Sequence, residues 1–286
     1  MKKRNLALAM VLAMAMTTMG SATVFADDAS DDAAGNDYTI AYVPTTMNNP
    51  FWTAMLGGIK EEMEAKGMDV DSQLVTVDAN SDQATMNNYV NDLIAQEVDA
   101  IILAPMDCTA VTEALQACED AGIPVISYDR LIKSDAVSYY ISFDNYTVGT
   151  LQGQYVIDTL DLDNAGDKTY NIEFTAGDPA DNNAGYFFNG AYDTLKPYLD
   201  AGTLNVVSGQ TDFDSVATAQ WDTQTALERM QNILASYYAD GTQLDVALCS
   251  NDSTALGVTQ AIESDYAGKN DVLITGQDGD EANLAN

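Results

Sequence analysis

The sequence predicts an α/β protein of two domains, each a parallel sheet with helices on both faces. Short β-branched runs alternate with amphipathic helical stretches along the chain, and these units form two series of similar size. Parallel strands joined by helical crossovers are buried on both faces, which fits this alternation. We place the crossing between the domains near Asp144, so that the first covers residues 38–143 and the second residues 144–286.

The predicted elements follow in order. Strands of the first series are expected over residues 39–44, 73–79, 100–105 and 124–129. Helices between them are indicated by apolar stripes at helical spacing, Met55, Ile59 and Met63 in one case and Val111, Leu115 and Cys118 in another. The segment 139–145 leads into a helix expected from Tyr146 to about Leu160. Strands of the second series are expected over residues 170–176, 204–209, 246–250 and 272–278.

The amino terminus has the pattern of a secretory signal peptide. A basic start precedes an apolar stretch from Leu6 to Met16 and small residues ending at Ala26, where we predict cleavage. The apolar stretch is shorter than the roughly 20 residues that a spanning helix needs, so no direct membrane insertion is expected. Residues 27–37 form an acidic leader that is predicted to be disordered, and no lipoprotein cysteine follows the apolar stretch. The protein is therefore expected in the periplasm or outside the cell.

Charge and composition exclude several classes of function. Without residues 1–26 the chain keeps 8 basic and 44 acidic residues, a formal charge of −36, so a nucleic-acid partner is not expected. The chain has no histidine, which rules out catalytic triads that use this residue and metal sites that it ligates. Cys108 and Cys118 flank most of one predicted helix, about 15 Å apart at 1.5 Å per residue, beyond disulfide reach. Cys249 ends a distant strand, so we predict three buried thiols.

Polar and aromatic residues cluster just after the predicted strands, where ligands bind in open parallel sheets. The first strand is followed by "NNPFW" at residues 48–52, and the fourth by Asp129 and Arg130. The second series carries "GDPADNNA", "AQWDTQTA", "CSNDS" and "TGQDGD" at the corresponding places. Flat apolar rings beside amides, carboxylates and a guanidinium suit a pyranose, which has apolar faces and a rim of hydroxyls.

This interpretation makes Phe51 and Trp52 a wall that faces the sugar, with Asn49 reaching a hydroxyl. A structural alternative stands beside it. Asn49 before Pro50 is also ordinary helix-capping chemistry, and both rings then pack beneath the helix. A structural role is equally open for Asp129, which would then pair with Arg130 or cap a turn. Asp252 is favoured as a helix cap.

Seven segments resemble the substrate-binding proteins of bacterial ABC sugar importers, of the ribose and galactose type. These are "NNPFW", "IPVISYDRLI", "YYISFDNYTVGTLQG", "GDPADNNA", "QWDTQTALERMQNILA", "SNDSTALGVTQAI" and "ITGQDGD", which together span residues 38–280. The similarity is greatest to the members that bind xylose or several monosaccharides. It implies a two-lobed periplasmic-binding-protein type I fold whose lobes close on one monosaccharide, such as xylose, glucose or a galactose-like sugar, by hinge motion. Crossings are implied near residues 144 and 280.

The resemblance also implies the site residues and the partners. Asn49, Phe51, Trp52, Asp129 and Arg130 would bind from the first lobe, and Asp181, Asn183, Trp221, Asn251 and Asp278 from the second. The partners are an ABC permease and, further, a chemoreceptor or sensor kinase, with no cofactor and no chemistry performed. Only eight residues, "GDEANLAN", follow the last predicted strand, so we expect a fragment that lacks the returning segments of the first lobe and one family contact.

Three further questions stay open. Galactose-binding relatives hold calcium before the strand that leads to "GDP", but Ala165 stands among Asp161, Asp163 and Asp167, so no metal is expected. A secreted hydrolase that uses paired carboxylates such as Asp129 and Asp278 is the alternative function. A sugar-responsive transcription regulator is disfavoured by the signal peptide, the charge and the lack of a helix-turn-helix before residue 38.

Overall fold

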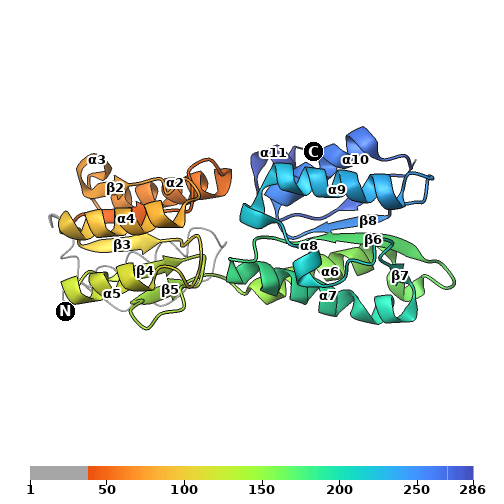
Figure 1. The fold of residues 1–286 in the computed structure, drawn as a ribbon, viewed down its shortest axis with the longest axis horizontal. Helices are drawn as coiled ribbons and strands as arrows, with labels where there is room; N and C mark the ends of the chain where they lie inside the picture. Colours follow the sequence, from red (N-terminus) through yellow and green to blue (C-terminus); the bar gives the residue numbers. More distant parts are fainter. Residues whose placement is uncertain (1–37, 269, 286) are drawn as a thin grey trace. The chain divides into compact units, whose positions relative to one another are not determined.

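The computed structural model describes residues 38–268 and 270–285, and the chain divides between Phe143 and Asp144 into two compact units (Figure 1). Each unit has its own parallel sheet and its own hydrophobic core. The predicted signal peptide, residues 1–26, and the predicted leader, residues 27–37, lie outside the described residues.

The first unit contains a five-stranded parallel sheet. In spatial order its strands are β2 (Leu74–Thr76), β1 (Ile40–Val43), β3 (Ala100–Leu103), β4 (Val125–Tyr128) and β5 (Tyr139–Ile141). Its helices are α2 (Pro50–Ala65), α3 (Val70–Gln73), α4 (Gln83–Ala95) and α5 (Thr112–Ala121). Because successive side chains of a strand point to opposite faces, the buried strands supply two separate cores.

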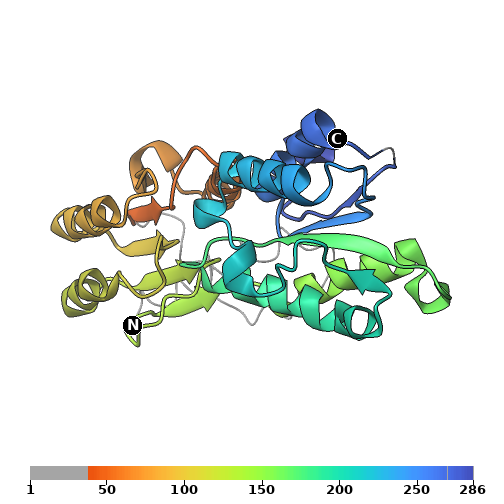
Figure 2. The same ribbon diagram turned by 45° about the vertical axis from the view of Figure 1, so that its right-hand side comes forward.

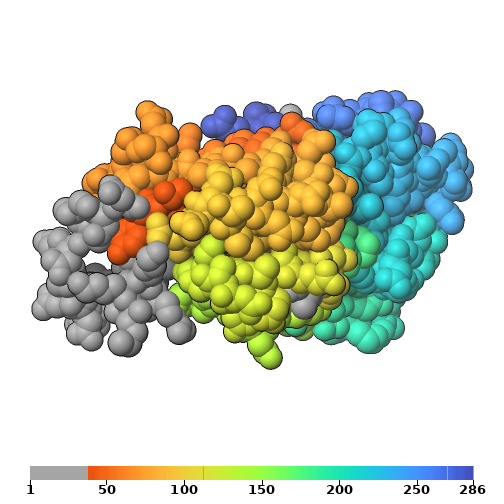
Figure 3. All heavy atoms as spheres, turned by 60° about the vertical axis from the view of Figure 1, so that its left-hand side comes forward, coloured from red at the N-terminus to blue at the C-terminus, as the bar shows by residue number. Residues whose placement is uncertain are grey.

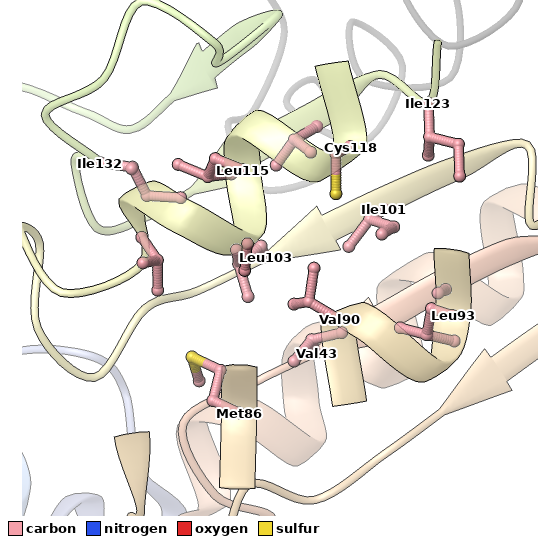
Figure 4. Close-up of a cluster of buried hydrophobic side chains, with 14 of the residues drawn as sticks. Val43, Met86, Val90, Leu93, Ile101, Leu103, Leu115, Cys118, Ile123 and Ile132 are labelled. Carbon is pink, nitrogen blue, oxygen red and sulfur yellow. The ribbon is translucent and has the colours of Figure 1, made fainter. Parts of the chain in front are cut away.

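One core of this unit lies between the sheet and helices α4 and α5. Val43, Ile101 and Leu103 point from the strands toward Val90 and Leu115 on these helices (Figure 4). The opposite face carries Tyr42, Ile102 and Ile126 against α2. Figure 3 shows one outer face of this unit, coloured orange to yellow-green.

The second unit contains a four-stranded parallel sheet. In spatial order its strands are β7 (Leu204–Asn205), β6 (Tyr170–Thr175), β8 (Val246–Cys249) and β9 (Leu273–Ile274). Its longer helices are α6 (Asn145–Leu160), α7 (Asn182–Ala201), α9 (Thr223–Tyr237) and α10 (Asp252–Asp265). Its short helices are η1 (Leu162–Asn164), α8 (Phe213–Val216), η2 (Ala219–Trp221) and α11 (Glu281–Leu284).

Helices cover both faces of this second sheet (Figure 2). Ile172 and Phe174 of β6 point toward α6 and α7, whereas Ala247 and Cys249 of β8 point toward α9 and α10. Helices α6 and α7 approach closely at Gly149, where an added Cβ would lie 2.0 Å from the carbonyl oxygen of Phe187. The α/β class predicted from the sequence, with helices on both faces of two parallel sheets, is therefore confirmed.

The observed strands are shorter than the sequence predicts, and three of them differ most. The strand predicted over 204–209 ends at Asn205, because the backbone N–H and hydroxyl of Ser208 bind the buried carboxylate of Glu173 instead of continuing the ladder. In the strand predicted over 73–79, the first residue is instead the last residue of the short helix α3, which Asp69 caps. This segment pairs as a strand only over Leu74–Thr76. The strand predicted over 272–278 pairs only over Leu273–Ile274.

The three cysteines are buried, as predicted, and the described residues contain no disulfide between them. Burial raises the pKa of the Cys118 thiol to about 11 and that of the Cys249 thiol to about 12. Neither thiol is therefore ionised at neutral pH. Within residues 38–268 and 270–285, we find no helix with the length and apolar character needed to cross a membrane.

Candidate functional site

The predicted site residues of the first unit follow the carboxyl ends of two strands, β1 and β4, which flank β3 in the sheet. Asn49, after β1, is the N-cap of α2, and its side-chain oxygen accepts a hydrogen bond of 2.9 Å from the backbone N–H of Phe51. Pro50 occupies the first helical turn, where its missing N–H costs nothing. An N-cap of this kind stabilises a helix by about 1 kcal/mol. The capping alternative for Asn49 is thus present in the structure, and its carboxamide is committed to the helix terminus.

Trp52 is almost fully buried, at 3% exposure, and Phe51 is half-buried beside it. The two rings meet edge to face, with centroids 4.8 Å apart and planes at 85°. Trp52 also belongs to the core cluster under α2, and Tyr42 donates a hydrogen bond to its carbonyl oxygen. Within this unit, the indole therefore packs as a core residue and leaves little of its surface for a ligand.

Arg130 connects the ends of β1, β3 and β4. It follows β4, it is only 5% exposed, and its guanidinium donates hydrogen bonds of 3.2 and 3.4 Å to the carbonyl oxygens of Pro105 and Met106, after β3. Its Cζ atom lies 5.7 Å from the centroid of the Trp52 ring, after β1. The planar guanidinium is thereby held in one orientation at the edge of the sheet.

Asp129, the residue before Arg130, has a left-handed backbone with φ of 63°. Its N–H donates to the carbonyl oxygen of Ile141, and its half-buried side chain stands where β4 ends. Residues other than glycine adopt this conformation at a cost of about 1–3 kcal/mol, and such positions cluster at functional sites.

The second unit fixes Trp221 through a hydrogen bond and close packing. Asp181 is the N-cap of α7, where one carboxylate oxygen accepts from the N–H of Asn183 and the other from the indole Nε1 of Trp221 at 3.1 Å. The indole covers Gly177, where an added Cβ would lie 2.0 Å from the ring. Trp221 has φ of 56°, also in the left-handed region, and is 7% exposed.

Asn251 and Asp278 form a direct pair in the loops that follow the neighbouring strands β8 and β9. The amide of Asn251 donates to a carboxylate oxygen of Asp278 at 3.3 Å, while its own oxygen caps α10 by accepting from the N–H of Thr254. Asp278 has φ of 101° and an exposed side chain. Asp252 does not cap the helix: it is the first helical residue, and its carboxylate accepts from the N–H of Asp280 and the amide of Asn283.

The structure therefore groups the ten predicted residues into two sets. One contains Asn49, Phe51, Trp52, Asp129 and Arg130 in the first unit, and the other Asp181, Asn183, Trp221, Asn251 and Asp278 in the second. The first set follows β1 and β4, on either side of β3, and the second set follows the neighbouring strands of the second sheet. Three of them, Asp129, Trp221 and Asp278, have positive φ.

Two buried amide side chains of α6 lie beside the second set of residues and were not among the predicted residues. Asn145 donates a hydrogen bond of 2.7 Å to Asn183, and Gln152 donates to carbonyl oxygens at the ends of β8 and β9. The sequence signal was available, because these amides share the buried face of α6 with Gly149 and Val156. A polar residue on an otherwise apolar or small face must find a partner.

The segment proposed for calcium in relatives is an ordinary capped turn here. Asp161 ends α6 with φ of 50°, and its carboxylate accepts from the amide of Asn164. Tyr198 donates to Asp163. Among the residues that the structure describes, no group of three acidic, histidine or cysteine side chains is arranged to hold a metal ion.

Comparison with known proteins identifies the family. The sequence model described as "Periplasmic binding protein domain" matches residues 40–286. The chain is 34% identical over 261 residues to the multiple sugar-binding periplasmic protein SbpA of Azospirillum brasilense, covering 90% of this chain and 71% of that protein. It is 35% identical over 251 residues to the multiple sugar-binding periplasmic receptor ChvE of Rhizobium radiobacter, covering 86% and 69%.

A solved structure agrees with this assignment. The solute binding protein of an ABC transporter from Clostridium phytofermentans, with bound β-D-glucose, superposes with a TM-score of 0.81 at 42% identity. The match covers 86% of this chain and 74% of that one. The chain therefore belongs to the family of periplasmic binding proteins.

Proposed function

We propose that this protein is the extracytoplasmic sugar-binding component of an ABC importer, which captures one monosaccharide and delivers it to a permease. The observation that carries the proposal is the pair of hydrogen-bonded arrangements in the second unit, Asp181 with Trp221 and Asn251 with Asp278. They place a buried indole and a carboxylate–amide pair after the ends of adjacent strands. This is the chemistry that a pyranose requires.

In this proposal both sets of residues bind the same sugar, and the two units act as lobes hinged near Asp144. Arg130 supplies paired donors to adjacent hydroxyls, and Asp278 accepts from a hydroxyl. Asn49 and Trp52 act indirectly in the first unit, because one caps α2 and the other supports the guanidinium. Hinge closure around a ligand is a common way for such proteins to exclude water from the polar contacts.

Relatives narrow the range of sugars in the proposal. SbpA and ChvE are described as binding multiple sugars, a protein of Escherichia coli as binding D-xylose, and the Clostridium phytofermentans protein contains glucose. We accordingly propose an aldohexose or aldopentose such as D-glucose, D-xylose or D-galactose. Export with cleavage after Ala26 belongs to the same proposal, and a chemoreceptor or sensor kinase is a second partner in it.

A thermal-shift screen of pentoses and hexoses tests the proposal. A ligand that binds only the native state stabilises it by about 2.7 kcal/mol at one hundred times its Kd, so the cognate sugar should raise the Tm in a saturable way. Amino acids and nucleotides serve as negative controls. The hydrolase alternative is separated by chromatography of a disaccharide or aryl glycoside after incubation with the protein. Intact substrate supports a binding protein, and released monosaccharide supports the hydrolase.

A further inference from the structure

The two loops that carry Asn251 and Asp278 leave the sheet where its backbone ladder ends. The last paired residues of β8 and β9 are Ala247 and Ile274, followed by one bond from the N–H of Thr275 to the carbonyl oxygen of Ala247. Between this bond and the next backbone bond, from the N–H of Asp252 to the carbonyl oxygen of Gln277, the two segments are joined by side chains. The Thr275 hydroxyl accepts a hydrogen bond from the N–H of Cys249 and donates one to its carbonyl oxygen, each 3.0 Å long.

Gln152 of α6 supplies the second connection from outside the sheet. Its amide nitrogen lies 3.2 Å from the carbonyl oxygen of Cys249, 3.5 Å from that of Ser250 and 3.3 Å from that of Gly276. The first two belong to the end of β8 and the third to the end of β9. One amide group, only 7% exposed, therefore ties together the two segments that lead to Asn251 and Asp278.

The orientation of this amide is determined by its surroundings. If the group were turned over, its oxygen would face three carbonyl oxygens and no donor. In the observed orientation the amide oxygen is buried and has no hydrogen-bond partner among the described residues. A buried acceptor without a partner is unfavourable, so the donor contacts to the three carbonyl groups must outweigh that penalty.

From this arrangement we infer that Gln152 is a positioning residue for sugar binding, which holds the Asn251–Asp278 pair in its binding geometry without touching the sugar. The inference rests on the proposed function. Two hydrogen bonds report on the geometry directly: the N–H of Asp252 donates to the carbonyl oxygen of Gln277, and the N–H of Asp280 donates to the Asp252 carboxylate. Both bonds connect the loop after β8 to the loop after β9.

Gln152→Met is the informative variant, because methionine keeps the length and volume of glutamine but removes the donor. The matched control is Asn270→Leu, because the Asn270 amide donates to the carbonyl oxygen of Leu244 at 2.7 Å, beside the opposite end of β8. Both variants remove one amide that braces the backbone near this strand. Only Gln152 lies at the end that carries the site. Gln152→Ala, which adds no bulk and favours a helix, is the second variant in case Gln152→Met does not fold.

The test measures backbone amide hydrogen exchange in the absence of sugar and D-glucose affinity by calorimetry. We expect Gln152→Met to accelerate exchange of the Asp252 and Asp280 amides at least tenfold and to raise the Kd about tenfold. Asn270→Leu should leave both values as in the wild type, even where it lowers the Tm. Unchanged exchange at these amides in the Gln152 variants, or faster exchange with unchanged affinity, overturns the inference. Because the exchange readout needs no ligand, a wild-type protein that binds no sugar counts against the proposed function alone.

Discussion

The contact between Trp221 and Gly177 makes a specific prediction about one added methyl group. In Gly177→Ala, the new Cβ would lie 2.0 Å from Cη2 of the indole and 2.2 Å from two neighbouring ring atoms. Carbon atoms in contact are separated by about 3.5 Å, so the ring must move by roughly 1.5 Å. Gly177 does not lie in the left-handed region, so alanine is compatible with its backbone.

Displacing the ring has two expected consequences. The 3.1 Å hydrogen bond from the indole to Asp181 cannot survive a shift of this size, and overpacking of a well-packed site costs about 1–3 kcal/mol. We therefore expect the Tm to fall and the sugar affinity to fall about tenfold or more, because the indole no longer presents its face in the same position. Thermal unfolding and calorimetry on the same sample measure the two effects.

A matched glycine provides the control. Gly58 lies inside α2, and outside the adjacent backbone of the helix no atom lies within 4 Å of its added Cβ. Gly58→Ala should therefore gain up to about 1 kcal/mol from helix propensity and keep its sugar affinity. If Gly177→Ala retains both the wild-type Tm and the wild-type affinity, the placement of the indole against Gly177 is wrong. If its Tm falls while its affinity stays unchanged, Trp221 is a core residue and not part of the site.

Three further predictions concern other parts of the molecule. Arg130→Lys should weaken sugar binding by about 2 kcal/mol in calorimetry, because an ammonium cannot reproduce the planar donors, and unchanged affinity would assign Arg130 a structural role. Asp181→Ala and Asp82→Ala each remove an N-cap worth about 1 kcal/mol, yet only Asp181→Ala should also lower sugar affinity. If the two variants bind sugar equally well, Asp181 has no role in sugar binding. The pKa of Cys249 is raised by burial to about 12 from 9.0, so its stabilising contribution is complete below pH 9 and is lost as pH rises toward 12. Cys249→Ala should therefore lose less stability than the wild type between pH 9 and 12 in denaturant titrations, and parallel curves would contradict this.

The sequence was sufficient for the architecture because the relevant signals are local. Alternating β-branched runs and amphipathic stretches require parallel sheets covered by helices, and both units have them. Strand length was harder to predict, since it depends on distant partners. The strand at Leu204 stops after two residues because Glu173, more than thirty residues earlier, is buried and binds Ser208 and Tyr238.

The placement of side chains at the candidate site was only partly accessible from the sequence. Spacing located Trp52 after the first strand, but the same residues fit a wall facing the sugar and a helix packed over its own core. In the structure this indole is 3% exposed, on the buried side of α2 and beside Arg130. The left-handed backbone of Trp221 could not be anticipated, because such a conformation is unusual for a bulky residue and is imposed by its surroundings.

Titration calorimetry of the purified protein with D-glucose, D-xylose and D-galactose tests the central claim most directly. We predict saturable heat with one sugar bound per chain for at least one of them, and recovery of that sugar unchanged after the titration. Absence of binding to all three, and to every other pentose and hexose in the thermal-shift screen, would contradict it.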